Sequence, residues 1–332
     1  MIDSVAIEEK ETDMTKNLLA TTEPLTQGID DYVRDVEVAR SNRVAPTFEG
    51  CPAATLVAVV RGEANAAYHA RPELSTSSLR VLGKSPAQFH RHHVLRHKSH
   101  AGTEATQYGT KFHSFWEIGP SVFWDVAKRV PAKFCTGSGG LSTKQDAQDW
   151  VKEQGPDAIL VTPSDEETLR AQHKQAMANR AFVELWEQVA EKEISIIWKR
   201  ASGTGLRCRP DAVLEDGRLI DFKTTRDQFP LKQWWHSCRE YGYGLQAAVY
   251  REGASLAGFS DEPMTFVVAS TVGECEVHCV TLPRRFVLMG QRKLDRLIEE
   301  YEDRMALDSW VPSSYGAITE LYMPPHVYGD EE

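Results

Sequence analysis

Two aspartates and a lysine, Asp211, Asp221 and Lys223, are spaced in a pattern that could hold a metal ion. They flank Asp216-Gly217, a dipeptide typical of the turn in a β-hairpin. Carboxylates that project to one side of adjacent strands suit Mg²⁺ or Mn²⁺, which prefer oxygen ligands. Such an ion can stabilise charge on a scissile phosphate and activate a water, which a lysine can orient. An isolated Asp-x-Lys, by contrast, is most often a structural ion pair.

The length of the turn decides whether Asp211 and Asp221 share a face. A two-residue loop would place Asp211 opposite Phe222, on the other face of the hairpin. A three-residue loop that ends at Gly217, in a left-handed bulge position, places Asp211 opposite Asp221. The same register gives the second face only apolar side chains. Because both criteria select one register, the sequence predicts the three-residue loop.

The elements that must position these residues follow from the periodicity of apolar residues. Strands are expected at 55–60, 122–130, 158–162, 193–198, 265–270 and 275–281, with 193–198 leading directly into the hairpin. Helices are expected at 73–83, 85–91, 106–117, 142–154, 164–191, 231–253 and 284–305. Strands interleaved with helices predict an α/β (α+β) fold, in which helices flank a central mixed β-sheet. Residues 1–50 are expected to be a loosely ordered arm, and 55–330 a single domain.

The composition indicates a soluble protein and excludes a membrane protein. No apolar run among the 332 residues is long enough to cross a bilayer, and the polar start does not resemble a signal peptide. Six scattered cysteines form no disulfide framework, so a reducing cytoplasm is the expected location. The net charge of −10 disfavours non-specific binding of polyanions, although one channel could still collect the basic groups.

Other residues outside the hairpin could contribute to a site. Gln246 and Tyr250 are four apart on one expected helix, so they share a face. Ser75 and Ser77 stand at the start of another helix, where hydroxyls cap the helix or hold a phosphate with the free N–H groups. His113 lies on a third helix, where a lone histidine is more often a hydrogen-bonded core residue than a ligand.

Together these residues resemble a known signature. Pro210-Asp211 and Asp221-Phe222-Lys223 are similar to the motif of PD-(D/E)xK nucleases, and Gln246-x-x-x-Tyr250 resembles the helix motif that follows it in many members. Further stretches, at 74–79, 85–89, 108–113 and 266–275, narrow the resemblance to the RecE-type exonucleases (exodeoxyribonuclease VIII). The resemblance extends from about residue 60 to the C-terminus. It implies a restriction-endonuclease-like PD-(D/E)xK core.

The resemblance implies a role for each hairpin residue. Asp211 and Asp221 would bind the metal, and the backbone carbonyl of Phe222 would complete its ligand shell. Lys223 would act on the nucleophilic water. His113 would take the upstream ligand position, which other branches of the superfamily fill with Glu. The implied cofactor is Mg²⁺, for which Mn²⁺ can substitute.

The resemblance also implies roles outside the hairpin. Gln246 and Tyr250 would belong to the catalytic group, while Ser75, Ser77 and Arg80 would hold the DNA end. RecE-type enzymes degrade linear double-stranded DNA from the 5′ end and assemble as a ring. They work with a single-strand annealing protein in phage or prophage recombination. The implied partners are therefore linear duplex DNA, an annealing protein and further copies of the chain, in a ring such as a tetramer.

One branch of the superfamily carries an iron–sulfur cluster, so the cysteines bear on the cofactor. Cys275 and Cys279 fall on one expected strand, where they would be about 13 Å apart. Ligands of a cluster must converge on one small cofactor, so no iron–sulfur cluster is expected.

The sequence thus predicts a Mg²⁺-dependent deoxyribonuclease, a processive 5′→3′ exonuclease on linear duplex DNA. Two alternatives stay open. One is an endonuclease or nickase of the same fold. The other is a catalytically silent DNA-binding scaffold for recombination. Every charged position of the motif is filled, which argues against this second alternative.

Overall fold

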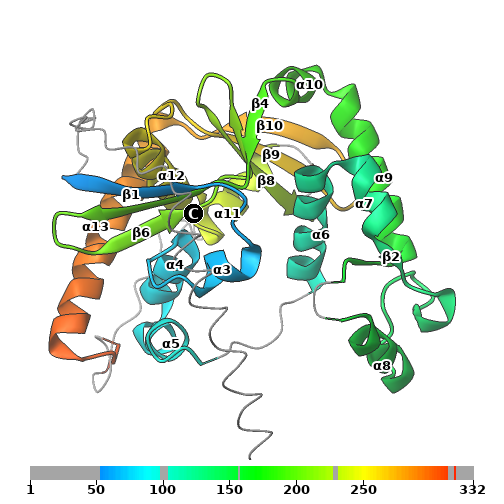
Figure 1. The fold of residues 1–332 in the computed structure, drawn as a ribbon, viewed down its shortest axis with the longest axis horizontal. Helices are drawn as coiled ribbons and strands as arrows, with labels where there is room; N and C mark the ends of the chain where they lie inside the picture. Colours follow the sequence, from blue (N-terminus) through cyan, green and yellow to red (C-terminus); the bar gives the residue numbers. More distant parts are fainter. Residues whose placement is uncertain (1–52, 98–103, 156–157, 227–230, 313–317, 319–332) are drawn as a thin grey trace, which may run out of the picture.

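The computed structural model describes residues 53–97, 104–155, 158–226, 231–312 and 318 (Figure 1). The predicted arm at 1–50 lies outside the described residues, as does most of the tail after residue 312. Among the described helices, none is both long enough and apolar enough to cross a membrane.

A mixed five-stranded sheet carries the hairpin. Its strand order is β10-β9-β8-β7-β4. Strands β8 and β9 are parallel, and the other neighbouring pairs are antiparallel. Two helices cross over between the parallel strands, as a parallel pair requires. The strands are β4 Val189–Lys192, β7 Ala212–Leu214, β8 Leu219–Thr225, β9 Thr265–Ser270 and β10 Val277–Thr281.

The hairpin β7–β8 has the predicted register. Ala212 pairs with Ile220, and the Leu214 N–H donates to the Arg218 carbonyl at 2.9 Å, so residues 215–217 form a three-residue loop. Gly217 closes the loop with a φ of 82°. A side chain there would also clash, because its Cβ would lie 2.7 Å from the Ser260 nitrogen. The loop prediction is confirmed.

A second, three-stranded sheet precedes the hairpin, with the order β1-β5-β6. Its strands are β1 Ala54–Val60, β5 Ser195–Arg200 and β6 Gly205–Cys208. Strand β6 was not predicted. The expected strand at 193–198 therefore does not lead directly into the hairpin, because the chain first turns back and pairs with itself.

The helices and two minor strands complete the fold. Strands β2 Lys128–Arg129 and β3 Leu160–Val161 form a separate two-stranded sheet, and Ala132–Phe134 is a 3₁₀ turn. The helices are α3 Asn65–Ala70, α4 Thr76–Lys84, α5 Pro86–Phe89, the π-helix His90–Val94, α6 Glu104–Ile118, α7 Pro120–Val126, α8 Gln145–Gln154, α9 Pro163–Ala178, α10 Arg180–Trp186, α11 Leu231–Glu240, α12 Tyr243–Leu256 and α13 Arg284–Leu307.

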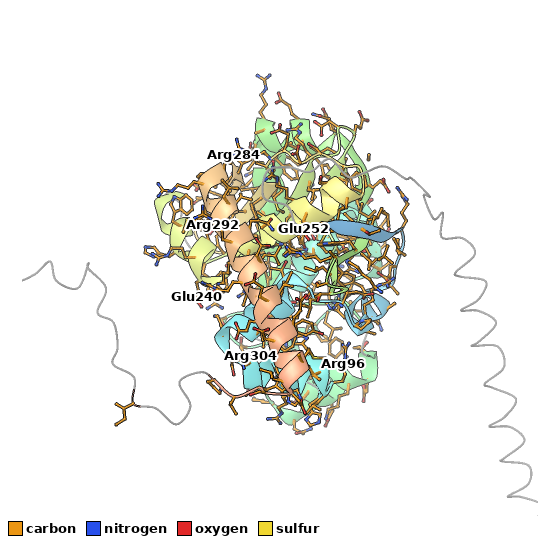
Figure 2. All side chains as sticks on the ribbon, turned by 90° about the vertical axis from the view of Figure 1, so that its left-hand side faces the viewer. Arg96, Glu240, Glu252, Arg284, Arg292 and Arg304 are labelled. Carbon is orange, nitrogen blue, oxygen red and sulfur yellow. The ribbon has the colours of Figure 1, made fainter. Side chains whose placement is uncertain are left out.

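The five-stranded sheet separates two hydrophobic cores. Ile220 and Phe222 face the core formed with α6, α9 and α10, whereas Leu219 and Phe266 face the core shared with α11, α12 and α13. This alternation follows the two-residue period of a strand. Figure 1 shows α6, α7, α9 and α10 on one side of the sheet and α13 on the other. Helix α13 runs along that second side, with Arg284, Arg292 and Arg304 spaced along it (Figure 2).

The prediction of a strand at 122–130 is wrong. Residues 120–126 form α7, and only Lys128–Arg129 is a strand. Pro120 occupies a first-turn position of α7, and the buried Phe123 anchors the helix. Tertiary packing thus overrides the β-propensity of this Val- and aromatic-rich segment.

Two predicted helices are each interrupted. Between 164 and 191, Asn179 caps a new helix, α10, and the last residues form strand β4. Between 231 and 253, Gly242 takes a left-handed conformation and separates α11 from α12. Cys275 also differs from the prediction, because it lies before β10 with a φ of 53° and does not share the strand of Cys279.

Candidate active site

Asp221 lies at the centre of a polar cluster on β8. Its side chain is buried, and the Gln246 side-chain amide donates a hydrogen bond to Oδ1. Lys223, two residues along the same strand, forms an ion pair with Oδ2. Helix α12 thereby brings Gln246 to the motif carboxylate.

Asp211 connects β7 to helix α6. Its Oδ1 hydrogen-bonds with His113 Nδ1 at 2.9 Å, and its Oδ2 accepts a hydrogen bond from the Phe222 N–H. His113 therefore reaches the hairpin from α6, although it is 98 residues away in sequence. The structure thus brings His113, Asp211, Asp221, Lys223 and Gln246 together.

Tyr250 approaches the same region by a different contact. Its hydroxyl donates to the backbone carbonyl of Arg209 at 3.1 Å, two residues before Asp211. Burial raises the pKa of Tyr250, so the hydroxyl stays protonated and keeps its role as donor. Tyr250 therefore holds the backbone that leads into the hairpin and is a positioning residue.

The electrostatics of the site affect its two motif carboxylates in opposite directions. Burial, together with the nearby charge of Asp211, raises the pKa of Asp221 to about 6 against the opposing effect of Lys223. Burial also raises the pKa of Asp211, but the His113 charge and hydrogen bond outweigh it and lower the pKa. Burial lowers the pKa of His113, yet Asp211 outweighs that effect and raises it. A divalent cation would relieve this concentration of buried negative charge.

Glu193 is a further member that the sequence analysis missed. It lies between β4 and β5 with a φ of 50°, and its Oε2 is 2.7 Å from Arg209 Nε. Burial and the charge of Asp211 raise the pKa of Glu193 to about 8. No motif marks this residue, because only the sheet pairing places it beside the hairpin.

The donor set fits a divalent metal. Within the described ranges, one group of three side chains, His113, Glu193 and Asp211, offers ligand atoms that all lie within 4.8 Å of one another. Carboxylate oxygens suit Mg²⁺ and Mn²⁺, and imidazole is a common ligand of transition metals. Asp221 lies beside this group in the neighbouring strand. These residues could therefore hold the ion that the PD-(D/E)xK motif implies.

A polar cavity of about 110 Å³ lies near this cluster, beyond Tyr68. The ring centre of Tyr68 lies 4.5 Å from the guanidinium of Arg209 and 5.0 Å from that of Arg207. Arg209 belongs to the carboxylate cluster, and Arg207 lines the cavity. The lining residues are His69, Arg71, Pro72, Glu73, Leu74, Ser75, Ser77, Ser78, Phe89, His93, Val94, Arg96, Arg207 and Tyr301.

The three residues predicted to hold a DNA end divide between two places. Ser75 and Ser77 line the cavity, where Ser75 also caps α4 by accepting a hydrogen bond from the Ser78 N–H. Arg80 is not part of the lining. Its guanidinium lies 5.8 Å from the ring centre of Tyr241.

Arg207 is the cavity residue best suited to an anion. It is buried, and its Nη1 donates to the carbonyls of Arg71 and Glu73. Its Nε has no hydrogen-bond partner within the described part of the chain. The alternation Arg207-x-Arg209 before the motif was the sequence signal that could have drawn attention to this pair.

Comparisons with known proteins bear on the fold and the family of the chain. The chain is similar to the crystal structure of a protein named "Putative exonuclease" from Eubacterium rectale, with a TM-score of 0.52 and 10% sequence identity. The match covers 82% of this chain and 100% of that one, and it shows the fold. A comparison with curated protein sequences gives no match.

The family described as "PDDEXK-like domain of unknown function (DUF3799)" matches residues 75–318, which include every residue of the cluster. The predicted fold class is therefore confirmed, as is the PD-(D/E)xK part of the resemblance. Members of this superfamily are nucleases that generally use divalent metals. The chain belongs to the family of PDDEXK-like domains, with the fold of the PD-(D/E)xK nucleases.

Proposed function

We propose that this protein is a Mg²⁺-dependent deoxyribonuclease that degrades linear double-stranded DNA as a processive 5′→3′ exonuclease. The observation that carries the proposal is the register of the β7–β8 hairpin. It sets Asp211 opposite Asp221, while α6 supplies His113 and α12 supplies Gln246 to the same place. Mn²⁺ is expected to substitute for Mg²⁺.

His113, Asp211, Asp221 and the Phe222 carbonyl would hold the ion. When bound, it would supply charge stabilisation at the scissile phosphate and a more acidic water. Gln246 fixes the orientation of the Asp221 carboxylate through its hydrogen bond. Lys223, ion-paired to the same carboxylate, lies where it can orient the attacking water or neutralise developing charge.

The cavity supports contact with a DNA phosphate. Arg207 contributes a positive charge to its lining, and the α4 N-terminus adds Ser75 and Ser77. Tyr68 and the two arginines against it join this cavity to the carboxylate cluster. We propose that the cavity holds the phosphate at the DNA end, and that Arg80 contacts DNA outside it. The action in phage-type recombination, the annealing partner and the ring are proposed from the sequence resemblance.

The test compares two substrates in Mg²⁺: a linear duplex with a 5′ phosphate and a covalently closed circle of the same sequence. Labels at the 5′ and 3′ ends of the linear duplex report the polarity. The proposal predicts digestion of the linear duplex from the 5′ end and an intact circle. Cleavage of the circle would show an endonuclease or nickase, and DNA binding without any cleavage would show a silent scaffold.

A further inference from the structure

Glu193 lies beside the proposed metal ligands but belongs to no part of the PD-(D/E)xK signature. One oxygen of Glu193, one of Asp211 and one nitrogen of His113 all lie within 4.8 Å of one another. Two ligands on opposite sides of an ion, each bonded at about 2.1 Å, are about 4.2 Å apart. The three atoms are thus close to the spacing that a single small cation requires.

The backbone directs Glu193 toward this place. Its N–H donates to the Asp211 carbonyl at 3.2 Å, directly beyond the last pair of strands β4 and β7. Its φ of 50° is one that side-chain-bearing residues adopt rarely. The Glu193 side chain is only 16% exposed, so the carboxylate is held among the protein groups of the site.

Arg209 is the present counter-ion of Glu193, at 2.7 Å. Other contacts fix Arg209 independently of that ion pair. Its Nη2 donates to Asn65 Oδ1 at 2.6 Å, its guanidinium lies over the ring of Tyr68, and Tyr250 holds its carbonyl. Arg209 can therefore stay in place when Glu193 changes partner.

We propose that Glu193 is an additional ligand of the divalent cation and that cation binding exchanges Arg209 for the metal. The inference rests on the proposed metal-dependent function. Within the described ranges, Glu193 is ion-paired with Arg209, Asp221 with Lys223, and Asp211 with His113. A divalent ion compensates the negative charge of Glu193 in place of Arg209. The Arg209 guanidinium can then pair with a substrate phosphate.

The exchange predicts that the two members of the ion pair differ in their effect on cation affinity. Mn²⁺ binding to the full-length chain without DNA can be followed by electron paramagnetic resonance. Glu193→Gln should weaken binding about tenfold or more, since it removes a charged ligand. Arg209→Met should leave the affinity unchanged or tighter, because it removes the competitor for Glu193. Glu191→Gln is the matched control, since Glu191 pairs with the exposed Arg61, and its affinity should stay within about twofold.

A purely structural ion pair would give a different pattern. Either partner's loss would then disturb the site equally, so equal weakening by Glu193→Gln and Arg209→Met would overturn the inference. Wild-type affinity in Glu193→Gln would overturn it as well. In both cases Asp211→Asn should still weaken Mn²⁺ binding. The proposed metal-dependent function would then be retained, and only the role of Glu193 would be overturned. Absence of Mn²⁺ binding to the wild-type chain would overturn the proposed function itself.

Discussion

Helix α12 contributes side chains to two buried polar clusters on different sides of the helix. The two clusters differ in how fully protein groups compensate the charge of their carboxylates. On one side, Glu252 is fully buried and accepts hydrogen bonds from Trp198 and from two nitrogens of Arg200. On the other side, Gln246 and Tyr250 face the hairpin, where the pKa of Asp221 is raised to about 6. The first cluster satisfies its carboxylate within the chain.

The second cluster leaves two carboxylates, those of Asp221 and Glu193, in surroundings that disfavour their charge. Burial and the charge of Asp211 raise the pKa of Glu193 to about 8. Buried charge that protein groups do not fully compensate is expected where a ligand supplies the compensation. From this difference we infer that the Glu252 cluster stabilises the fold, and we propose that the hairpin cluster binds a ligand and takes part in chemistry.

The largest expected effect is on stability, at the Glu252 cluster. Arg200→Met leaves Glu252 buried without its counter-ion, so the free energy of unfolding should fall by about 3–5 kcal/mol. Chemical denaturation measures the change. Arg61→Met is the control, since its pair with Glu191 is exposed and should contribute at most about 1 kcal/mol. Equal losses of unfolding free energy in the two variants would show that the buried Glu252 cluster contributes no more stability than an exposed ion pair.

The next effect is on activity, at the hairpin cluster. Asp221→Asn keeps the size of the side chain but removes a charged ligand, so DNA cleavage in Mg²⁺ should fall at least about 100-fold to 1,000-fold. Its free energy of unfolding should stay within about 1 kcal/mol of the wild-type value or rise, because an unfavourable buried charge is lost. A strongly destabilised variant that still cleaves DNA would reverse the roles assigned to the two clusters.

A smaller effect on both quantities is expected where Tyr250 joins α12 to the hairpin. Tyr250→Phe removes the hydrogen bond to the Arg209 carbonyl, which should cost about 0.5–1.5 kcal/mol of stability. Cleavage should fall about tenfold, since the backbone before the motif loses its restraint. Tyr108→Phe removes a comparable bond, to Gln172, and should lower stability alone. Equal cleavage by the two variants would contradict a positioning role for Tyr250.

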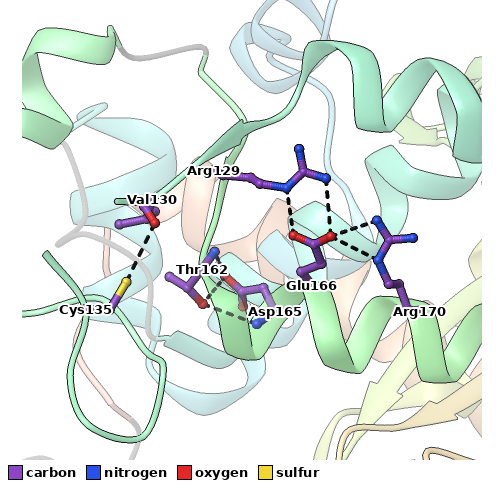
Figure 3. Close-up of polar contacts among 7 residues, drawn as sticks. All are labelled: Arg129, Val130, Cys135, Thr162, Asp165, Glu166 and Arg170. Carbon is purple, nitrogen blue, oxygen red and sulfur yellow. Dashed lines mark hydrogen bonds and ion pairs between the residues drawn. The ribbon is translucent and has the colours of Figure 1, made fainter. Parts of the chain in front are cut away.

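The smallest effect concerns an ion-pair network near the protein surface. Glu166 accepts hydrogen bonds from Arg129 and Arg170, which lower its pKa to about 2 (Figure 3). A lowered carboxyl pKa stabilises the folded protein above the ordinary value of 4.5, and this contribution disappears as the pH falls toward 2.

Because this network is partly solvated, Glu166→Gln should cost at most about 1 kcal/mol at neutral pH. The stability difference between Glu166→Gln and the wild type should vanish between pH 4.5 and about 2. Unfolding midpoints measured across that range test the expectation. A difference that persists at pH 2, or that exceeds the Arg200→Met effect, would contradict the distinction between buried and solvated clusters.

The parts of the site that the sequence predicts are those set by local pattern. The hairpin register followed from the turn signal and from the alternation of apolar residues, both of which lie within a short segment. The spacing of a helix put Gln246 and Tyr250 on one face, but the place of Gln246 in the site was implied by the resemblance and not by the spacing.

The parts that could not be predicted depend on tertiary contacts. Glu193 joins the site because β4 pairs with β7, and no spacing in the sequence records that pairing. The segment 122–130 has strand propensity but becomes α7, because Pro120 and the buried Phe123 fix a helix there. Arg80 shares a short segment with Ser75 but packs on Tyr241, a contact that depends on the break between α11 and α12.

Binding of a divalent ion by the hairpin cluster should stabilise the folded protein. The unfolding free energy of the wild-type chain and of Asp211→Asn is measured while Mg²⁺ is titrated. The wild type should gain about 2.7 kcal/mol when Mg²⁺ reaches 100 times its dissociation constant, because only the folded site binds the ion. Asp211→Asn should gain much less at the same concentration. Equal gains of unfolding free energy in both proteins, or no gain in the wild type, would contradict binding of the ion at the hairpin cluster.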